Sequence, residues 1–448
     1  MDLKGKRVLV VGLGKTGVAT AGFLLERGAD AVLTDERPLE EFRESLGNIG
    51  SRCETRVHGA AAVEGIDIII PSPGVPPSNV ILQEGLKRGV PILSEVEVAF
   101  RFLEKPMIAV TGTNGKTTVT TLLGRVLAES GRSVFVGGNI GEPLIGYVNG
   151  TQKDDIAVVE VSSFQLLYTD RFRPGAAILL NTTYDHIDYH GSFEAYREAK
   201  ERIFMNQESD DLAILNADEP ASQGLSGRIR AGVRFFSSRS EVGDGMFLDG
   251  DLLRLRAPGK QDETYPLDMI RIPGIHNIEN VMAVILAARF FGCPHDEIVG
   301  AIRNFRGIPH RIQFAGEKRG VAFYDDSKGT NVGAVVRALE SFSKPTILLL
   351  GGRDKGGDFE NLSSLLRERV KEVILFGEAG GHIREKISGV IRTSLVPTMK
   401  EAVAIAYGRA VRGDVVLLSP GCSSFDEFSG YAERGRIFQE TVEGLPDG

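Results

Sequence analysis

The sequence predicts an α/β protein with three domains. Short apolar strands alternate with helical stretches along the chain, a rhythm typical of parallel sheets covered by helices. The rhythm starts afresh twice, which divides the chain into residues 1–96, 97–307 and 308–448. A length of 448 residues agrees with this division, since domains average roughly 150 residues.

The first domain opens with a strand, a glycine-rich turn and a helix. We expect strands at residues 7–11 and 31–34 on either side of a helix at 18–27, followed by strands at 66–70 and 92–93. A βαβ start of this kind predicts a Rossmann-like domain.

The second and third domains repeat the alternation of strands and helices. In the second domain we expect strands at 107–110, 156–161, 176–180 and 212–215. A Gly- and Asp-rich stretch at 233–272 predicts a small antiparallel extension, and a helix at 278–291 closes the domain. In the third domain we expect strands at 322–324, 346–350, 373–376 and 415–418, which predict a second Rossmann-like sheet.

Composition and charge exclude several classes of protein. A formal net charge of −8 argues against a nucleic-acid partner. No apolar run approaches the roughly 18 residues of a membrane span, and no signal-peptide core follows Met1, so we expect a cytoplasmic protein without membrane contact. Cys53, Cys293 and Cys422 form no C-x-x-C pair, which favours buried reduced thiols.

The strongest motif is Thr111-Gly-Thr-Asn-Gly-Lys-Thr-Thr118, which lies between an apolar strand and a predicted helix at 119–129. Its glycines let backbone N–H groups approach phosphate oxygens, and the helix N-terminus adds positive charge. Lys116 can reach the β- and γ-phosphates of ATP, and the Thr117 hydroxyl can hold Mg²⁺. The motif predicts a P-loop ATPase-like central sheet, although Val110 replaces the first glycine of the full pattern; a structural turn is the alternative.

Two further strand ends carry groups suited to a metal. Glu160 ends the strand at 156–161 and can bind Mg²⁺ directly or through water. Asp185, His186 and Asp188 follow the strand at 176–180. Because open α/β sheets bind ligands at the carboxyl edge of their strands, we expect these side chains beside the phosphate loop. A structural carboxylate and a surface histidine are the alternatives.

The first domain also carries Gly12-x-Gly14-x-x-Gly17, with Asp35 at the end of the next strand. This pattern is the dinucleotide fingerprint and favours NAD when taken alone. However, about 95 residues are too few for two mononucleotide halves and a substrate domain. We therefore interpret the turn as a diphosphate site, with a structural turn and an NAD-dependent oxidoreductase as alternatives.

Two polar turns follow strands of the third domain. They are Tyr-Asp-Asp-Ser-Lys-Gly-Thr-Asn at 324–331 and Gly-Gly-Arg-Asp-Lys-Gly-Gly at 351–357. Hydroxyls and a cation at a carboxyl edge suit a small anionic substrate. Each segment can also be only a polar turn.

Together these motifs resemble the Mur ligase family, the ATP-dependent amino-acid-adding enzymes of peptidoglycan synthesis. The resemblance covers essentially the whole chain and rests on segments 111–118, 160–165, 185–188, 196–200, 274–277, 309–311 and 326–331. The turn at 12–17, Glu-Val-Ser-Ser-Phe-Gln at 160–165 and Leu-Ser-Pro-Gly-Cys-Ser-Ser-Phe-Asp at 418–426 are most similar to the branch that adds D-glutamate.

The resemblance implies a reaction and its reactants. ATP converts the L-alanine carboxylate of UDP-N-acetylmuramoyl-L-alanine into an acyl phosphate, and the amine of D-glutamate then displaces phosphate. The first domain would bind UDP, the central domain ATP, and the third domain the amino acid. The resemblance further implies a pair of Mg²⁺ ions, a carbamylated Lys200, and a monomer whose partners are these small molecules.

The resemblance also implies the roles of individual residues. The catalytic residues are Lys116, His186 and Lys200, and the metal-binding residues are Thr117, Glu160, His186 and Lys200. The ATP-binding residues are Gly112, Thr113, Asn114, Gly115, Lys116, Thr117, Thr118, Asn277, Arg311 and Asp326. The substrate-binding residues are Lys15, Thr16, Asp35, Glu36, Arg37, Asn139, Thr330, Lys355, Ser424 and Phe425. Lys15 and Tyr431 depart from the family pattern, which has an apolar residue and a Phe there.

Two further alternatives are open at this point. Folylpolyglutamate synthetase shares the phosphate loop and the activation of a carboxylate, but it lacks the glycine-rich first domain. A P-loop switch without catalysis would turn ATP over slowly and would not respond to D-glutamate.

Overall fold

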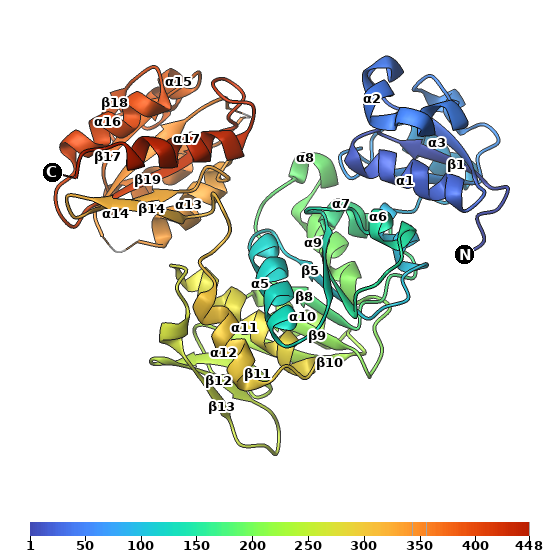
Figure 1. Ribbon diagram of the computed structural model, residues 1–448, viewed down its shortest axis with the longest axis horizontal. Helices are drawn as coiled ribbons and strands as arrows, with labels where there is room; N and C mark the ends of the chain where they lie inside the picture. The colour runs from blue at the N-terminus through green and yellow to red at the C-terminus, as the bar shows by residue number, and fades with distance from the viewer. Residues whose placement is uncertain (343, 355, 448) are drawn as a thin grey trace. The chain divides into compact units, whose positions relative to one another are not determined.

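The computed structural model describes residues 1–342, 344–354 and 356–447. Within them the chain forms an α/β fold with three sheets, as the sequence predicts (Figure 1). The chain divides into two compact units, Met1–Met269 with Ile278–Asn304, and Ile270–Asn277 with Phe305–Gly448. The first two sheets belong to the first unit and the third sheet to the second unit. The domain boundaries at residues 96 and 307 stay predictions.

The N-terminal sheet has four parallel strands in the order β3-β2-β1-β4. The strands are β1 (Arg7–Val11), β2 (Asp30–Thr34), β3 (Glu54–Thr55) and β4 (Ile68–Pro71), and the helices are α1 (Lys15–Glu26), α2 (Arg43–Leu46) and α3 (Val80–Arg88). Helix α1 begins at Lys15 rather than at residue 18, directly after the glycine-rich turn. The strand expected at 92–93 is a single bridge between Ile69 and Ile92.

The central sheet has nine strands in the order β13-β12-β11-β10-β9-β8-β5-β7-β6. They are β5 (Met107–Thr111), β6 (Val134–Gly138), β7 (Ile156–Glu160), β8 (Ala176–Leu179), β9 (Leu212–Asn216), β10 (Gly232–Ser237), β11 (Gly245–Asp249), β12 (Leu252–Arg256) and β13 (Glu263–Pro266). Every residue of β5, β7, β8 and β9 is buried. Such continuous apolar strands are expected where helices cover both faces of a parallel sheet.

The helices of this part of the chain are α4 (Glu95–Phe100), α5 (Lys116–Glu129), α6 (Leu144–Asn149), α7 (Ser163–Leu167), α8 (Ile187–His190), α9 (Phe193–Glu201), α10 (Pro220–Ser226), α11 (Ile275–Phe290) and α12 (His295–Asn304). Helix α5 packs on β6 and β7, which fixes its N-terminus at the carboxyl edge of the sheet. Figure 1 shows α5 beside the strands of the central sheet.

The antiparallel extension is smaller than the sequence predicts. Strand β10 pairs in parallel with β9, and β11 pairs in parallel with β10. Only the β11–β12 and β12–β13 pairs are antiparallel. The stretch at 233–272 therefore first prolongs the parallel sheet and only then turns into hairpins.

The second unit is built on a six-stranded sheet in the order β14-β15-β19-β16-β17-β18. Its strands are β14 (Gln313–Lys318), β15 (Val321–Asp325), β16 (Thr346–Gly351), β17 (Val370–Phe376), β18 (Thr393–Leu395) and β19 (Val415–Gly421). Its helices are α13 (Val332–Glu340), α14 (Ser363–Arg369), α15 (Gly380–Lys386), α16 (Met399–Arg409) and α17 (Tyr431–Glu443). All pairs are parallel except β14–β15. Two apolar clusters fill the two faces of this sheet.

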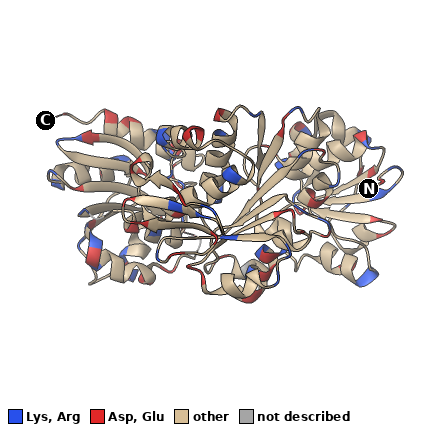
Figure 2. Ribbon diagram, turned by 90° about the horizontal axis from the view of Figure 1, so that it is seen from below, with Lys and Arg blue, Asp and Glu red and all other residues tan. Residues whose placement is uncertain are grey.

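Residues of both charge signs are scattered along the ribbon (Figure 2). This mixture agrees with the modest net charge of −8. In the part of the chain that the structure describes, no helix combines the length and the apolar character that a membrane span needs.

Candidate functional site

The phosphate loop connects β5 to α5, and its backbone requires glycine at two positions. Gly112 has φ 153° and Gly115 has φ 85°, values that residues with a Cβ rarely adopt. A Cβ on Gly115 would also lie 2.4 Å from Oδ1 of Asn280 on α11. The loop therefore wraps tightly around the N-terminus of α5, the geometry in which backbone N–H groups bind phosphate.

Asn181, after β8, anchors this loop from the neighbouring strand. Its carbonyl accepts the N–H of Thr113 at 2.9 Å, and its Oδ1 accepts the N–H of Asn114 at 2.9 Å. Its Nδ2 donates back to the carbonyl of Asn114 at 3.2 Å. Sequence reasoning assigned Asn181 no role, although its position directly after a buried strand was a usable signal.

Two lysines converge on the same loop carbonyl. Lys116 Nζ donates to the carbonyls of Gly112 at 2.8 Å and Thr113 at 2.9 Å. Lys200 Nζ, from α9, donates to the Gly112 carbonyl at 2.9 Å and lies 4.6 Å from the centre of the Tyr196 ring. The structure thus brings together two of the three predicted catalytic residues.

Lys200 is held in an environment that disfavours its charge. Its side chain is only 1% exposed. Burial lowers the pKa of Lys200 well below its usual value, and the charge of Lys116 lowers it further, whereas Asp185 and Glu160 act in the opposite direction. This environment favours the neutral amine, which is the nucleophilic form of the side chain.

Thr117, Glu160 and Asn139 form one hydrogen-bonded group at the same edge. Thr117 Oγ1 donates to Glu160 Oε2 at 2.8 Å, and Asn139 Nδ2 donates to Glu160 Oε1 at 2.8 Å. Glu160 is 2% exposed, so these two donors support a buried carboxylate. The predicted proximity of the phosphate loop and Glu160 is confirmed by these distances.

The donor set at this edge suits Mg²⁺ better than a tightly ligated transition metal. Among the described residues, no group of three or more His, Cys, Asp or Glu side chains could hold a metal. Mg²⁺ commonly takes one or two protein oxygens and completes its shell with water and substrate phosphates. The Thr117 hydroxyl and the Glu160 carboxylate fit that pattern.

His186 lies after β8 in a left-handed conformation with φ 52°. Its Nε2 is 3.6 Å from Asp185 Oδ2, and its ring is 4.8 Å from the Phe164 ring and 6.3 Å from the Tyr196 ring. Tyr196 in turn bonds Oγ1 of Thr113 through its hydroxyl at 3.0 Å. The ring of His186 is therefore linked to the phosphate loop through Tyr196, which contacts Thr113. Its role as a metal ligand stays a prediction.

The glycine-rich turn of the N-terminal sheet is closed by Asp35. Asp35 accepts the N–H of Leu13 at 2.7 Å and the N–H of Arg37 at 3.0 Å. Although burial acts to raise it, these bonds and the Arg37 guanidinium hold the pKa of Asp35 below its usual value. Gly17 packs directly on this turn, because a Cβ there would lie 2.0 Å from the Gly12 carbonyl.

The other predicted residues of this turn lie around it. Glu36 accepts a hydrogen bond from Asn79 at 3.2 Å, and Thr16 lies in the first turn of α1. Lys15 Nζ donates to the carbonyl of Gly141 at 2.6 Å, which joins the turn to the connection that carries Asn139. The sheet has four strands, too few for the two halves of a dinucleotide-binding domain, which argues against the NAD alternative.

The second unit holds the remaining residues predicted to bind ATP. Asp326 follows β15, is buried, and accepts a hydrogen bond from Ser419 Oγ at 2.7 Å. Burial raises the pKa of Asp326 to about 7, against the opposing effects of Ser419 and Arg311. Asn277 donates to the carbonyl of Pro273 at 2.6 Å. Asn277, Arg311 and Asp326 all lie in this unit.

The predicted amino-acid site lies on loops of the same unit. Thr330 lies in the turn that follows β15. Ser424 and Phe425 follow β19, and Ser424 is 2% exposed whereas Phe425 is 60% exposed. Lys355 lies outside the described residues.

Sequence reasoning missed Arg434 on α17, which is 0% exposed and donates to the carbonyls of Ser327 at 2.9 Å, Cys422 at 3.0 Å and Ser423 at 3.3 Å. These bonds tie the loops after β15 and β19 together.

Glu95, on α4, makes a testable contribution to the pH dependence of stability. It is 1% exposed and accepts the N–H of Ile145 at 2.7 Å and Nε2 of Gln165 at 3.3 Å. Burial raises the pKa of Glu95 to about 7 from 4.5, although both bonds oppose the shift. Between these pH values the folded protein keeps a proton that the unfolded chain has lost, so this contribution to stability falls as pH rises.

We therefore expect Glu95→Gln to gain stability relative to the wild type as pH rises from 4.5 to 7, by roughly 1.4 kcal/mol per pH unit. Denaturant unfolding across that range measures the difference, with the exposed Glu26→Gln on α1 as control. A constant difference between Glu95→Gln and the wild type at every pH contradicts the expectation.

Comparison with known proteins adds to this geometry. Three family descriptions match successive parts of the chain: "Mur ligase MurD-like, N-terminal domain" over residues 6–94, "Mur ligase middle domain" over 110–288, and "Mur ligase, glutamate ligase domain" over 310–422. The chain is 56% identical to a protein of Syntrophus aciditrophicus named UDP-N-acetylmuramoylalanine--D-glutamate ligase, over 99% of each chain. It is 42% identical to a protein of the same name from Koribacter versatilis, over 100% of this chain and 99% of the relative.

A solved structure shows the same fold at low sequence identity. It is a pseudomurein peptide ligase type C from Methanothermus fervidus, with a TM-score of 0.61 and 18% identity over 99% of this chain and 100% of that one.

Proposed function

The chain belongs to the Mur ligase family, and from that premise we propose that it joins D-glutamate to UDP-N-acetylmuramoyl-L-alanine with ATP, in peptidoglycan precursor synthesis. The observation that carries the proposal is the convergence of Lys116 and Lys200 on the Gly112 carbonyl, beside the Thr117–Glu160 pair. This arrangement serves the transfer of a phosphoryl group.

The chemistry follows from the poor leaving group of a carboxylate. An amine cannot expel oxide, so ATP first converts the L-alanine carboxylate into an acyl phosphate, and the D-glutamate amine then expels phosphate. During the transfer, Lys116 and the backbone N–H groups of the loop neutralise charge on the phosphoryl oxygens. A pair of Mg²⁺ ions, held by Thr117, Glu160 and ATP, would add further positive charge there.

Lys200 takes part as a carbamate in this proposal. Its neutral amine adds to CO₂ and loses a proton, which converts a buried nitrogen into a carboxylate-like group. That group would place a third negative charge near Glu160 and Asp185. Because like charges repel in a buried site, a bound cation or the Lys116 ammonium would have to balance it. His186 is proposed to contact the metal or the muramoyl substrate from the same edge.

The substrates are assigned to the loops described above. The N-terminal turn, with Lys15, Thr16, Asp35, Glu36 and Arg37, binds the UDP group in this proposal, and Asn139 binds the muramoyl part. Asn277, Arg311 and Asp326 contact ATP. Thr330, Lys355, Ser424 and Phe425 receive D-glutamate.

The setting of the reaction is also part of the proposal. ATP and a UDP-linked precursor are cytoplasmic metabolites, so we assign the step to the cytoplasm. All partners are small molecules, and the protein acts as a monomer.

Phosphate release tests the proposed function. With ATP and Mg²⁺, we expect release only when both UDP-N-acetylmuramoyl-L-alanine and D-glutamate are present, and little release when L-glutamate replaces D-glutamate. Release that continues at the same rate after either substrate is omitted would overturn the proposal, as would NADH-dependent absorbance changes with a reducible substrate.

A further inference from the structure

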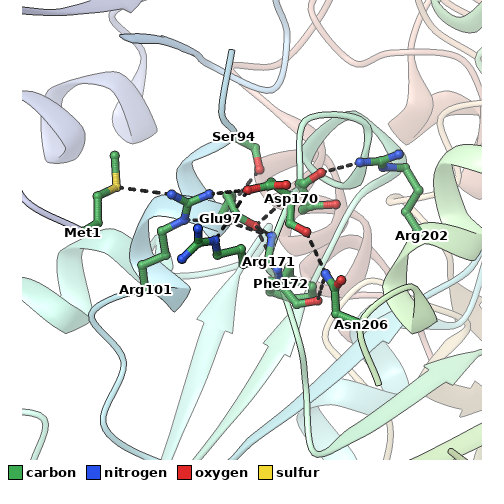
Figure 3. Close-up of polar contacts among 10 residues, drawn as sticks. Met1, Ser94, Glu97, Arg101, Asp170, Arg171, Phe172, Arg202 and Asn206 are labelled. Carbon is green, nitrogen blue, oxygen red and sulfur yellow. Dashed lines mark hydrogen bonds and ion pairs between the residues drawn. The ribbon is translucent and has the colours of Figure 1, made fainter. Parts of the chain in front are cut away.

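Glu97, on helix α4, is a fully buried carboxylate, and both of its oxygens accept hydrogen bonds. Oε2 accepts the N–H groups of Asp170 at 2.9 Å and Phe172 at 2.9 Å, and the N–H of Arg171 is 3.1 Å from each oxygen. Oε1 also accepts Nε of Arg101 at 2.6 Å. Figure 3 shows Glu97 between Arg101 and this run of three consecutive backbone N–H groups.

The same stretch of backbone is held from its other side by residues that follow α9. Arg202 donates from Nε to the carbonyl of Leu166 at 3.0 Å, and its guanidinium also donates to the carbonyl of Thr169. Asn206 Nδ2 donates to the carbonyl of Asp170 at 2.8 Å. In Figure 3, Arg202 and Asn206 approach from the side opposite Arg101.

The segment between these two sets of contacts, residues 166–172, runs from the last two residues of α7 toward β8. Helix α7 follows Glu160, at the end of β7. Lys200 lies in the last turn of α9, two residues before Arg202. Segment 166–172 therefore links Glu97 to two residues of the phosphate site. It continues α7, which follows Glu160, and it accepts hydrogen bonds from Arg202, two residues after Lys200.

We propose that Glu97 is a positioning residue, which holds segment 166–172 so that Lys200 and Glu160 keep their places beside the phosphate loop. This inference rests on the proposed function for its catalytic meaning. Glu97 is distant in sequence from the loop it supports, and it sits on the helix that follows the N-terminal sheet.

The chemistry of the contact explains why a carboxylate is needed. Three successive backbone N–H groups form a concave donor surface that an anion satisfies. An amide in the same place presents one oxygen and one NH₂ group, and the NH₂ group would face the Nε–H of Arg101. The change of Glu97 to Gln therefore removes the salt bridge while it keeps the shape of the side chain.

The test compares Glu97→Gln with a matched control, Glu372→Gln. Glu372, at the start of β17 in the second unit, is 4% exposed and accepts a bond from Ser394 Oγ at 2.9 Å and a bond from Arg409. Both substitutions thus remove the charge of a buried carboxylate that pairs with arginine, but only Glu97 contacts segment 166–172.

Two readouts do not depend on turnover. We expect Glu97→Gln to speed hydrogen exchange of the backbone amides of α9, and to weaken Mn²⁺ binding in the presence of a non-hydrolysable ATP analogue by about tenfold. Mn²⁺ binding is followed by electron paramagnetic resonance. In the ligase assay, kcat should fall with little change in the KM for D-glutamate, and Glu372→Gln should match the wild type in all three measurements.

The proposal is overturned if Glu97→Gln shows faster exchange only at residues 170–172, while exchange of α9 and Mn²⁺ affinity equal those of the wild type. If Glu97→Gln does not fold, Glu97→Asp, which keeps the charge but shortens the side chain so that it no longer reaches all three N–H groups, takes its place with the same expectations. A wild-type protein that makes no product would overturn the proposed function, whereas exchange and Mn²⁺ binding would still decide the role of Glu97.

Discussion

Replacement of Lys116 by alanine should lower D-glutamate-dependent phosphate release by a factor of about 10²–10³, the usual effect of removing one preorganised group that stabilises transition-state charge. Lys116 is half-buried at the N-terminus of α5, and its ammonium reaches the carbonyls of Gly112 and Thr113. When ATP binds, the same ammonium is placed to meet the phosphates. Initial rates of phosphate release at saturating substrates measure the effect.

The fold should survive this substitution. The loop backbone is held independently by Asn181 and by the glycines at 112 and 115, so we expect the thermal unfolding transition of Lys116→Ala to stay close to that of the wild type. Lys260→Ala, at an exposed turn between β12 and β13, is the control and should keep full activity. Unchanged ATP turnover in Lys116→Ala would remove the phosphate loop from the mechanism.

Lys200→Ala should also nearly abolish the reaction, with a loss of about 10²-fold or more, because a negatively charged group beside the metal and the γ-phosphate is missing. Addition of a short carboxylic acid, such as acetate or propionate, should restore part of the activity. The restored carboxylate can occupy the space that the buried Lys200 side chain leaves. Rates measured against acid concentration should rise and saturate.

Two comparisons make this experiment decisive. Lys116→Ala lacks a cation rather than a carboxylate, so the same acids should not restore its activity. Removal of dissolved CO₂ should lower the activity of the wild type and leave acid-rescued Lys200→Ala unaffected. Full activity of Lys200→Ala without added acid contradicts the carbamate.

The elements predicted best from the sequence are those with local causes. The phosphate loop, between a fully buried strand and a helix, specifies its own geometry through the backbone freedom of its glycines and the N–H groups at the helix N-terminus. The position of Glu160 beside Thr117 also follows from local reasoning, because parallel strands bring their carboxyl ends to one edge.

The features that sequence reasoning missed have long-range causes. Glu97 looks like an ordinary helical acid, and only the fold shows that residues 170–172 direct three N–H groups at it. Arg434 is a charged residue on a terminal helix, yet it is fully buried among the carbonyls of two other loops. Strand β10 was expected to be antiparallel, but it pairs in parallel with β9. The direction of a strand depends on its partner strand, and the residues of β10 themselves do not specify it.

The most direct test of the central claim follows the oxygen atoms of the substrate. UDP-N-acetylmuramoyl-L-alanine whose alanine carboxylate carries isotopically heavy oxygen is incubated with ATP, Mg²⁺ and D-glutamate, and the phosphate and the nucleotide product are analysed by mass spectrometry. Activation as an acyl phosphate predicts one heavy oxygen in each phosphate released and one D-glutamate added to each nucleotide product. Phosphate without heavy oxygen, with D-glutamate joined or not, would contradict the transfer of the γ-phosphate to the carboxylate.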